Sequence, residues 1–246
     1  MKCLVINLDR STDRLAHVTS EFARLGVPFE RVPALDANAG CPIHVPSLTS
    51  AEVCCFLSHR ACWQIIADGA DRYGAVFEDD VVFSRNAGPL LSQDNWVLRD
   101  ADVIKLETFF TKVRVARRSV AIGHGYSLTR LVGEHVGAAG YLVSKTAAQK
   151  LLQRTRNPKT FIDHVLFSPN LPTCSLNTTY QLTPALCAQN QFFSNKPALP
   201  TLIQDDAPHR KRNLAYKIVG EASRAFAHCR NGSLWGTEKI TIALHR

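Results

Sequence analysis

Three consecutive carboxyl groups, those of Glu78, Asp79 and Asp80, interrupt an otherwise apolar segment at 75–83. An isolated carboxylate is costly to bury, so such groups normally pair, take up a proton or bind a metal ion. Successive strand residues point to opposite faces, which predicts Glu78 and Asp80 on one face and Asp79 on the other. Their oxygens suit Mg²⁺ or Mn²⁺, and such an ion would neutralise a diphosphate leaving group. The apolar flanks favour this metal site over a solvated or Arg-paired acidic cluster.

A second candidate binding segment runs from Asn7 to Arg14, between a buried strand expected at 3–8 and the helix that follows it. The N-terminus of a helix at this edge of a sheet attracts phosphate. Arg10 and Arg14 are one helical turn apart and can grip a diphosphate together. The alternative is that the two arginines pair with Asp9 and Asp13 on the surface, and the sequence alone does not decide between the two.

Two histidines and two further carboxylates lie in apolar surroundings. His59, next to Ser58, is either a hydrogen-bonded core histidine or a member of the site. Asp163 can serve as a general base or as the N-cap of a short helix, and His164 as a further metal ligand. Glu107 follows a strand at 102–106 and is a second candidate base.

The elements that must position these residues alternate along the chain. Expected strands lie at 3–8, 29–32, 75–83, 102–106, 111–115 and 138–144, and apolar periodicity predicts helices at 15–25, 49–68 and 147–152. This alternation predicts an α/β fold with a mostly parallel central sheet flanked by helices, and ligands at the carboxyl ends of its strands.

The 246 residues, of which 46% are apolar and 20% charged, fit one soluble domain with a tail and exclude disorder throughout. The N-terminus lacks the features of a signal peptide, and the chain contains no apolar stretch of about twenty residues. We therefore expect a cytoplasmic protein, and we interpret its eight cysteines as free thiols of a reducing compartment.

The basic character is concentrated at the C-terminal end. Residues 207–246 carry eight Lys and Arg side chains against two Glu, a net +6 out of +8 for the whole chain. We therefore divide the chain into a domain at 1–206 and a basic tail at 207–246. The tail contains an amphipathic helix expected at 209–230, which either contacts an anionic membrane surface or packs on its own domain.

Seven short segments, taken in order, resemble glycosyltransferase family 25, which includes bacterial lipopolysaccharide and lipooligosaccharide glycosyltransferases and collagen galactosyltransferases. The matching segments are VINLDR at 5–10, VPALDA at 32–37, CFLSH at 55–59, VFEDDV at 76–81, DVIKL at 102–106, GYLVSK at 140–145 and FIDH at 161–164. They span roughly the first two-thirds of the chain. The loop at 36–47, with Cys41 and Pro42, departs from the charged turn that the family has there.

The resemblance implies a GT-A-like, Rossmann-type fold and an inverting transfer of a hexose, galactose or glucose, from a UDP-sugar to a glycan or glycolipid acceptor. It also implies Mn²⁺ or Mg²⁺ at the acidic segment. With the residues above, it gives donor-binding candidates Asn7, Leu8, Asp9, Arg10, Arg14, Ser58, His59 and Asp79, metal ligands Glu78, Asp80 and His164, and Asp163 as base with Glu107 in reserve.

Two other classes of protein remain as alternatives. One is a non-catalytic relative that binds a glycan or a partner protein; the intact acidic segment argues against it. The other is a basic nucleic-acid-binding protein or a metal-dependent nuclease. Its aromatic residues should be interleaved with basic ones as stacking platforms, and that pattern does not occur here, so we expect no nucleic-acid partner.

Overall fold

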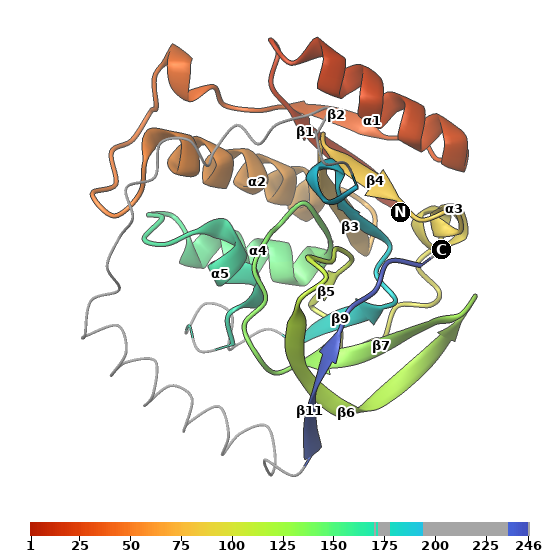
Figure 1. Ribbon diagram of the computed structural model, residues 1–246. Helices are drawn as coiled ribbons and strands as arrows, with labels where there is room; N and C mark the ends of the chain where they lie inside the picture. Colours follow the sequence, from red (N-terminus) through yellow and green to blue (C-terminus); the bar gives the residue numbers. More distant parts are fainter. Residues whose placement is uncertain (170, 172–177, 194–235, 246) are drawn as a thin grey trace.

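The computed structural model describes residues 1–169, 171, 178–193 and 236–245 (Figure 1). Its helices are α1 (Thr12–Leu25), α2 (Ser50–Asp68), α3 (Ala87–Ser92), α4 (Lys145–Arg154) and α5 (Ile162–Phe167), with short 3-10 turns η1 (Ala37–Ala39) and η2 (Asn190–Phe192). Its strands are β1 (Lys2–Asn7), β2 (Glu30–Pro33), β3 (Tyr73–Glu78), β4 (Val81–Phe83), β5 (Val103–Lys105), β6 (Lys112–Gly123), β7 (Tyr126–Leu131), β8 (Gly140–Ser144), β9 (Thr179–Thr183), β10 (Cys187–Gln189) and β11 (Thr237–Thr241).

A mixed sheet of nine described strands runs through the molecule in the order β11-β6-β7-β9-β5-β8-β3-β1-β2. Strands β1, β2 and β3 pair in parallel, as do β5 and β9, while β8 runs antiparallel between β3 and β5. Antiparallel pairing continues through β7, β6 and β11. Six of the nine strands point in one direction, which confirms the predicted α/β class with a mixed, mostly parallel sheet.

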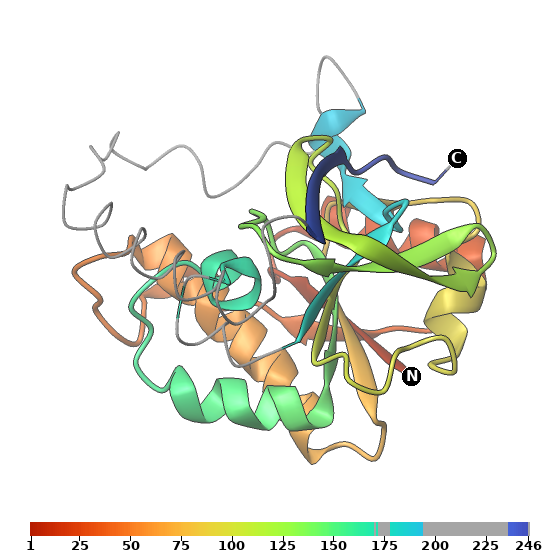
Figure 2. The ribbon, with the colours of Figure 1, turned by 90° about the horizontal axis from the view of Figure 1, so that it is seen from below.

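Helices cover both faces of this sheet, and Figure 2 separates the two layers, with α2, α4 and α5 on the left and α1 and α3 on the right. Strand β1 contributes side chains to the hydrophobic cores on both faces of the sheet. Leu4 packs in the cluster around Phe56 and Trp63, and Val5 packs in the cluster around Phe22. Burial on both faces explains why this strand reads as a continuous apolar run.

Helix α2 begins at the predicted capping box. The Thr49 hydroxyl accepts from the Glu52 amide, and the Glu52 carboxylate accepts from the Thr49 amide at 2.7 Å. Nearly all of its inward side chains are apolar, so the helix lies against β1, β2, β3 and α4. This packing fixes the part of α2 that holds Cys55, Ser58 and His59.

The acidic segment is not one strand from 75 to 83, as the sequence pattern predicted. Strand β3 ends at Glu78, Asp79 and Asp80 form a turn, and β4 pairs antiparallel with β10 in a separate two-stranded sheet. The predicted alternation is wrong for the same reason, because side chains in a turn do not follow the period of a strand. Asp79 and Asp80 both face Arg14.

The end of the chain returns to the sheet. Strand β11, at 237–241 in the predicted tail, pairs antiparallel with β6. The amphipathic helix predicted at 209–230 lies outside the described residues, so the boundary at 206 stays a prediction. In the part of the chain that the structure describes, no helix is long and apolar enough to cross a membrane, and six of the cysteines are free thiols.

Candidate functional site

A cavity of about 580 Å³ opens at the carboxyl ends of β1 and β3, between the loop at 34–38 and the first half of α2. That volume suits a small-molecule ligand. The predicted residues that line it are Asn7, Leu8, Arg10, Arg14, Ser58, His59, Glu78, Asp79 and Asp80. The predicted Asp9, Glu107, Asp163 and His164 are not among its lining residues. Asp9 instead pairs with Arg31.

Buried polar contacts fix the acidic turn from the α1 side. Arg14 Nη1 donates to Asp79 Oδ1 at 2.7 Å, and Asn7 Nδ2 donates to Asp79 Oδ2 at 2.8 Å. The Asn7 side-chain carbonyl in turn accepts from Arg31 Nε at 2.9 Å. Asp79 and Arg14 are 5% and 8% exposed, so this ion pair is shielded from solvent and orients the turn. Arg14 therefore pairs with the carboxylates of the acidic turn and not with Asp13.

Asp80 is a buried carboxylate with spare ligand capacity. Its Oδ2 accepts from Gln189 Nε2 at 3.3 Å and lies 3.8 Å from Arg14 Nη2. Its Oδ1 is buried and has no hydrogen-bond partner among the described residues. Burial, followed by the charge of Glu78, raises the pKa of Asp80 to about 7. A carboxylate in this state is stabilised by a cation, which supplies the missing contact.

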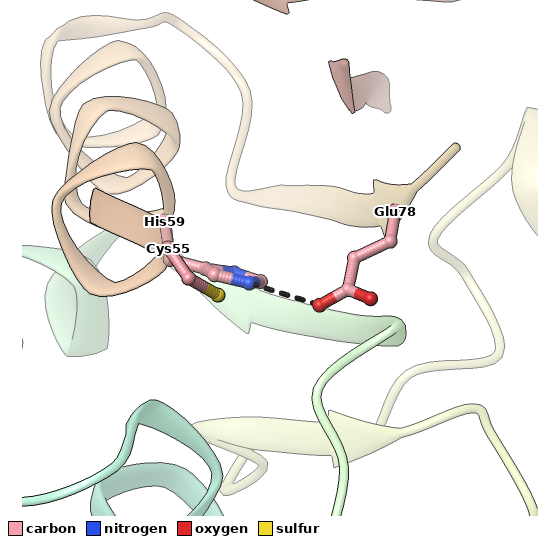
Figure 3. Close-up of side chains that lie close together, drawn as sticks. All are labelled: Cys55, His59 and Glu78. Carbon is pink, nitrogen blue, oxygen red and sulfur yellow. Dashed lines mark ion pairs between the residues drawn. The ribbon is translucent and has the colours of Figure 1, made fainter. Parts of the chain in front are cut away.

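Glu78 lies at the end of β3 and faces α2. Burial and the neighbouring charge of Asp79 raise its pKa to about 7. Its Oε1 is 3.5 Å from His59 Nε2 (Figure 3). On the far side of that ring, His59 Nδ1 lies 3.0 Å from the Tyr141 hydroxyl, to which Trp63 Nε1 donates at 2.9 Å. Burial lowers the pKa of His59 to about 4, so its imidazole is neutral at pH 7.

The loop beside the cavity is anchored by Ser58 and Arg10. The Ser58 hydroxyl donates to the Cys54 carbonyl at 2.7 Å and accepts from the Leu35 amide at 2.9 Å. Arg10 Nε donates to Asp36 Oδ2 at 2.6 Å on the exposed rim. Ser58 therefore holds the loop against α2, while the exposed guanidinium of Arg10 lies at the mouth of the cavity.

A fully buried ion pair, which sequence reasoning did not predict, lies behind the site. Lys105 Nζ donates to Glu107 Oε2 at 3.0 Å and to the Gly137 carbonyl at 2.6 Å, and it lies 4.4 Å from the centre of the Phe167 ring. Glu107 Oε2 also accepts from the Ala139 amide. Burial raises the pKa of Glu107 to about 7. Lys105 ends β5 and Glu107 follows in an isolated β-bridge. Extended residues two positions apart share a face, so the sequence did contain a signal for this pair.

Asp163 is half-buried and lies in the first turn of α5, whose N-cap is Phe161, so the N-cap alternative for Asp163 is wrong. Its Oδ2 accepts from the Gly137 amide at 3.0 Å. The apolar residues of α5 pack in the core cluster of Phe56 and Trp63, so Asp163 belongs to the face of the sheet that α2 covers.

His164 is paired away from the acidic turn, with its Nε2 3.2 Å from Glu134 Oε1. Within the described ranges, a single group of three potential ligand side chains has all its ligand atoms within 4.8 Å of one another, and it consists of Cys55, His59 and Glu78. The predicted set of Glu78, Asp80 and His164 does not form such a group, so this geometry does not support His164 as a metal ligand.

Comparison with known proteins gives the site a context. Residues 1–166 match the profile of Glycosyltransferase family 25 (LPS biosynthesis protein). The chain is 32% identical to the lacto-N-neotetraose biosynthesis glycosyltransferase LgtB of Neisseria gonorrhoeae, over 91% of this chain and 87% of that protein. It is 30% identical to the lipooligosaccharide biosynthesis protein lic2B of Haemophilus influenzae, over 89% of this chain and 90% of that one.

Solved structures that align with this chain have lower sequence identity to it than these relatives. The galactosyltransferase LgtC in complex with donor and acceptor sugar analogs aligns with a TM-score of 0.36 at 12% identity, over 66% of this chain and 68% of that one. A glycosyltransferase involved in glycosylation of the major capsid of PBCV-1 aligns with a TM-score of 0.42 at 10% identity, over 80% and 96%.

Proposed function

Because this chain belongs to glycosyltransferase family 25, we propose that it transfers a hexose, galactose or glucose, from a UDP-sugar to a lipooligosaccharide or lipopolysaccharide acceptor, with inversion at the anomeric carbon. The biosynthetic roles in the names of LgtB and lic2B support this acceptor class. The observation that carries the proposal is the acidic turn, where the half-buried Glu78 and the buried Asp80, both with raised pKa values, line a cavity of ligand size.

The turn fits a hard divalent cation. Asp80 has a buried oxygen without a partner, and Glu78 is held nearby at the end of β3. Carboxylate oxygens are the ligands that Mg²⁺ and Mn²⁺ prefer. We assign Asp80 and Glu78 to hold that ion, with diphosphate and water filling the remaining coordination. When bound, the ion neutralises the charge that develops on the departing diphosphate.

Chain residues around the turn bind and orient the donor. Arg14 and Asn7 hold Asp79 and thereby keep Asp80 directed toward the cavity. Arg10 has an exposed guanidinium at the cavity mouth, and giving up its contact with Asp36 for a phosphate costs little, because the pair is open to solvent. The loop held by Ser58 forms one wall of the same cavity.

Asp163 is the better candidate for the base that removes the proton of the acceptor hydroxyl. Its carboxylate is half-buried and accepts only backbone hydrogen bonds in the part of the chain that the structure describes. Glu107 is fully buried and bonded to Lys105, so an acceptor hydroxyl cannot reach it without displacing that pair. A base must lie within hydrogen-bond reach of the proton it takes.

Exposed aromatic rings beside the turn are suited to the acceptor sugar. The η2 turn is joined to the acidic turn by the hydrogen bond from the Asn190 amide to the Asp80 carbonyl, at 2.8 Å. Phe192 of η2 packs against Phe110 with ring centres 5.9 Å apart, and the two rings are 39% and 40% exposed. Exposed apolar surface of this kind marks a binding site, and the faces of pyranose rings stack on aromatic side chains.

We place the reaction in the cytoplasm, where UDP-sugars are available to the enzyme. The net charge of residues 207–246 favours contact with the anionic inner face of the membrane, where a lipid-linked acceptor would lie.

Donor binding and hydrolysis test the proposal. Nucleotide sugars are screened by thermal shift and by release of the nucleotide, with and without Mn²⁺, on wild type, Asp80→Asn and the exposed control Asp71→Asn. We expect one UDP-hexose to be turned over only with metal. Asp80→Asn should lose on the order of 100-fold or more of that rate, while Asp71→Asn keeps it. Failure of every nucleotide sugar to bind would point to the non-catalytic alternative.

A further inference from the structure

Cys55, His59 and Glu78 form a group of potential ligands that includes a thiol and an imidazole, which are not the ligands typical of a Mg²⁺ or Mn²⁺ site. Cys55 and His59 are four residues apart on α2 and so share one face of that helix, and Glu78 meets them from the end of β3 (Figure 3). A thiolate and an imidazole are soft or borderline ligands, which select Zn²⁺, Co²⁺ or Cd²⁺ over Mg²⁺ and Mn²⁺.

The spacing of the three ligand atoms is compatible with one small ion. The bond lengths of tetrahedral zinc place neighbouring nitrogen and oxygen ligands roughly 3.3 Å apart. His59 Nε2 and Glu78 Oε1 are 3.5 Å apart, and all three ligand atoms lie within 4.8 Å of one another. A slight closing of the three ligand atoms around an ion would complete a three-ligand site, and all three residues line the cavity, which leaves room for a further ligand there.

The surroundings of His59 supply the independent sign of a ligand. Its Nε2 is buried and has no hydrogen-bond partner in the described structure, although the residue is only 1% exposed. Its other nitrogen is held by the Tyr141 hydroxyl, which Trp63 also contacts. Metal-binding histidines characteristically have this arrangement, in which a partner on one nitrogen directs the other at the ion.

We propose that Cys55, His59 and Glu78 form a binding site for a soft or borderline divalent cation of the Zn²⁺ class, and that its occupancy inhibits transfer. On binding, the Cys55 thiol exchanges its proton for the metal, which releases one H⁺. Glu78, which already faces α2, is then a ligand of this ion and is no longer available to the hard cation beside Asp80. The inhibition, unlike the binding, rests on the proposed function.

Cobalt is the probe for the site, because a thiolate bound to Co²⁺ gives a near-ultraviolet charge-transfer band that needs no enzyme activity. The full chain is titrated with Co²⁺ as wild type, Cys55→Ser and the neighbouring control Cys54→Ser. We expect one ion per chain, with the band present in wild type and Cys54→Ser and lost in Cys55→Ser. Tyr141→Phe should weaken binding about 10- to 100-fold.

Asp80→Asn separates this proposal from the proposed function. It should keep the cobalt band while losing Mn²⁺-dependent donor turnover, and the fraction of turnover lost to added Zn²⁺ should fall in Cys55→Ser. Absence of the band in folded wild type, or its persistence in Cys55→Ser, would overturn the site. A band without inhibition by Zn²⁺ would overturn the inhibitory role alone, and a band in a protein that turns over no donor would count against the proposed function only.

Discussion

Replacing Arg14 by Met tests whether the buried ion pair organises the acidic turn. The substitution keeps the length of the side chain but leaves Asp79 charged and 5% exposed, with Asn7 as its remaining side-chain donor. Removing one partner of a buried pair costs about 3–5 kcal/mol, because the other charge remains buried. For a chain of this size, that cost corresponds to a melting temperature lower by roughly 6–20 °C.

Urea and thermal denaturation of purified protein measure the effect, and Arg10→Met is the matched control. Arg10 is paired with Asp36 in solvent, so the same substitution there should change stability little. Adding Asp79→Asn to Arg14→Met removes the unpaired charge and should recover part of the loss. Equal effects of Arg14→Met and Arg10→Met, or a double variant whose losses simply add, would refute the reasoning.

Two further predictions follow from the site. The pKa values of Glu78 and Asp80 are both raised to about 7. Between about pH 4.5 and pH 7, the folded chain therefore keeps protons that the unfolded chain has released. Without metal, these two groups lower the stability of the fold as the pH rises through that range. Since Mn²⁺ requires the ionised carboxylates, the rise in melting temperature on adding Mn²⁺ should be larger at pH 8 than at pH 6; a rise independent of pH would contradict the assignment. Phe192→Ala should raise the KM for the acceptor about two- to tenfold, the equivalent of ~0.5–1.5 kcal/mol, and leave the KM for the donor unchanged, as steady-state kinetics with each substrate varied would show.

The sequence predicted the sheet best where burial dictates residue type. Strands β1, β2, β3, β5 and β8 and helices α1, α2 and α4 lie close to their expected positions, because their apolar periodicity is long and their ends carry caps such as Thr49. Strands β7, β9, β10 and β11 were not predicted. They are short or antiparallel, and their residues show little alternation that a single sequence reveals.

Contacts between residues far apart in the sequence could not be predicted from the sequence alone. The sequence identified Arg14, Asp79 and Asp80 as functional candidates, but not that Arg14 joins the two aspartates in one buried network. That pairing depends on the turn at Asp79 and on the angle between α1 and β3. Likewise, the pairing of His164 with Glu134 depends on where the loop before β8 passes.

The turn at Asp79 explains why one acidic segment can serve two purposes. Had the strand continued to Phe83, Glu78 and Asp80 would share a face and Asp79 would be directed into the opposite core without Arg14. Ending β3 at Glu78 instead leaves that side chain facing His59 on α2, while Asp80 turns toward Gln189 and the cavity. Glu78 therefore lies between the thiol and imidazole of α2 and the carboxylate of Asp80, which prefer different kinds of metal ion. The affinities and concentrations of the two kinds of ion would therefore decide which of the two proposed sites forms.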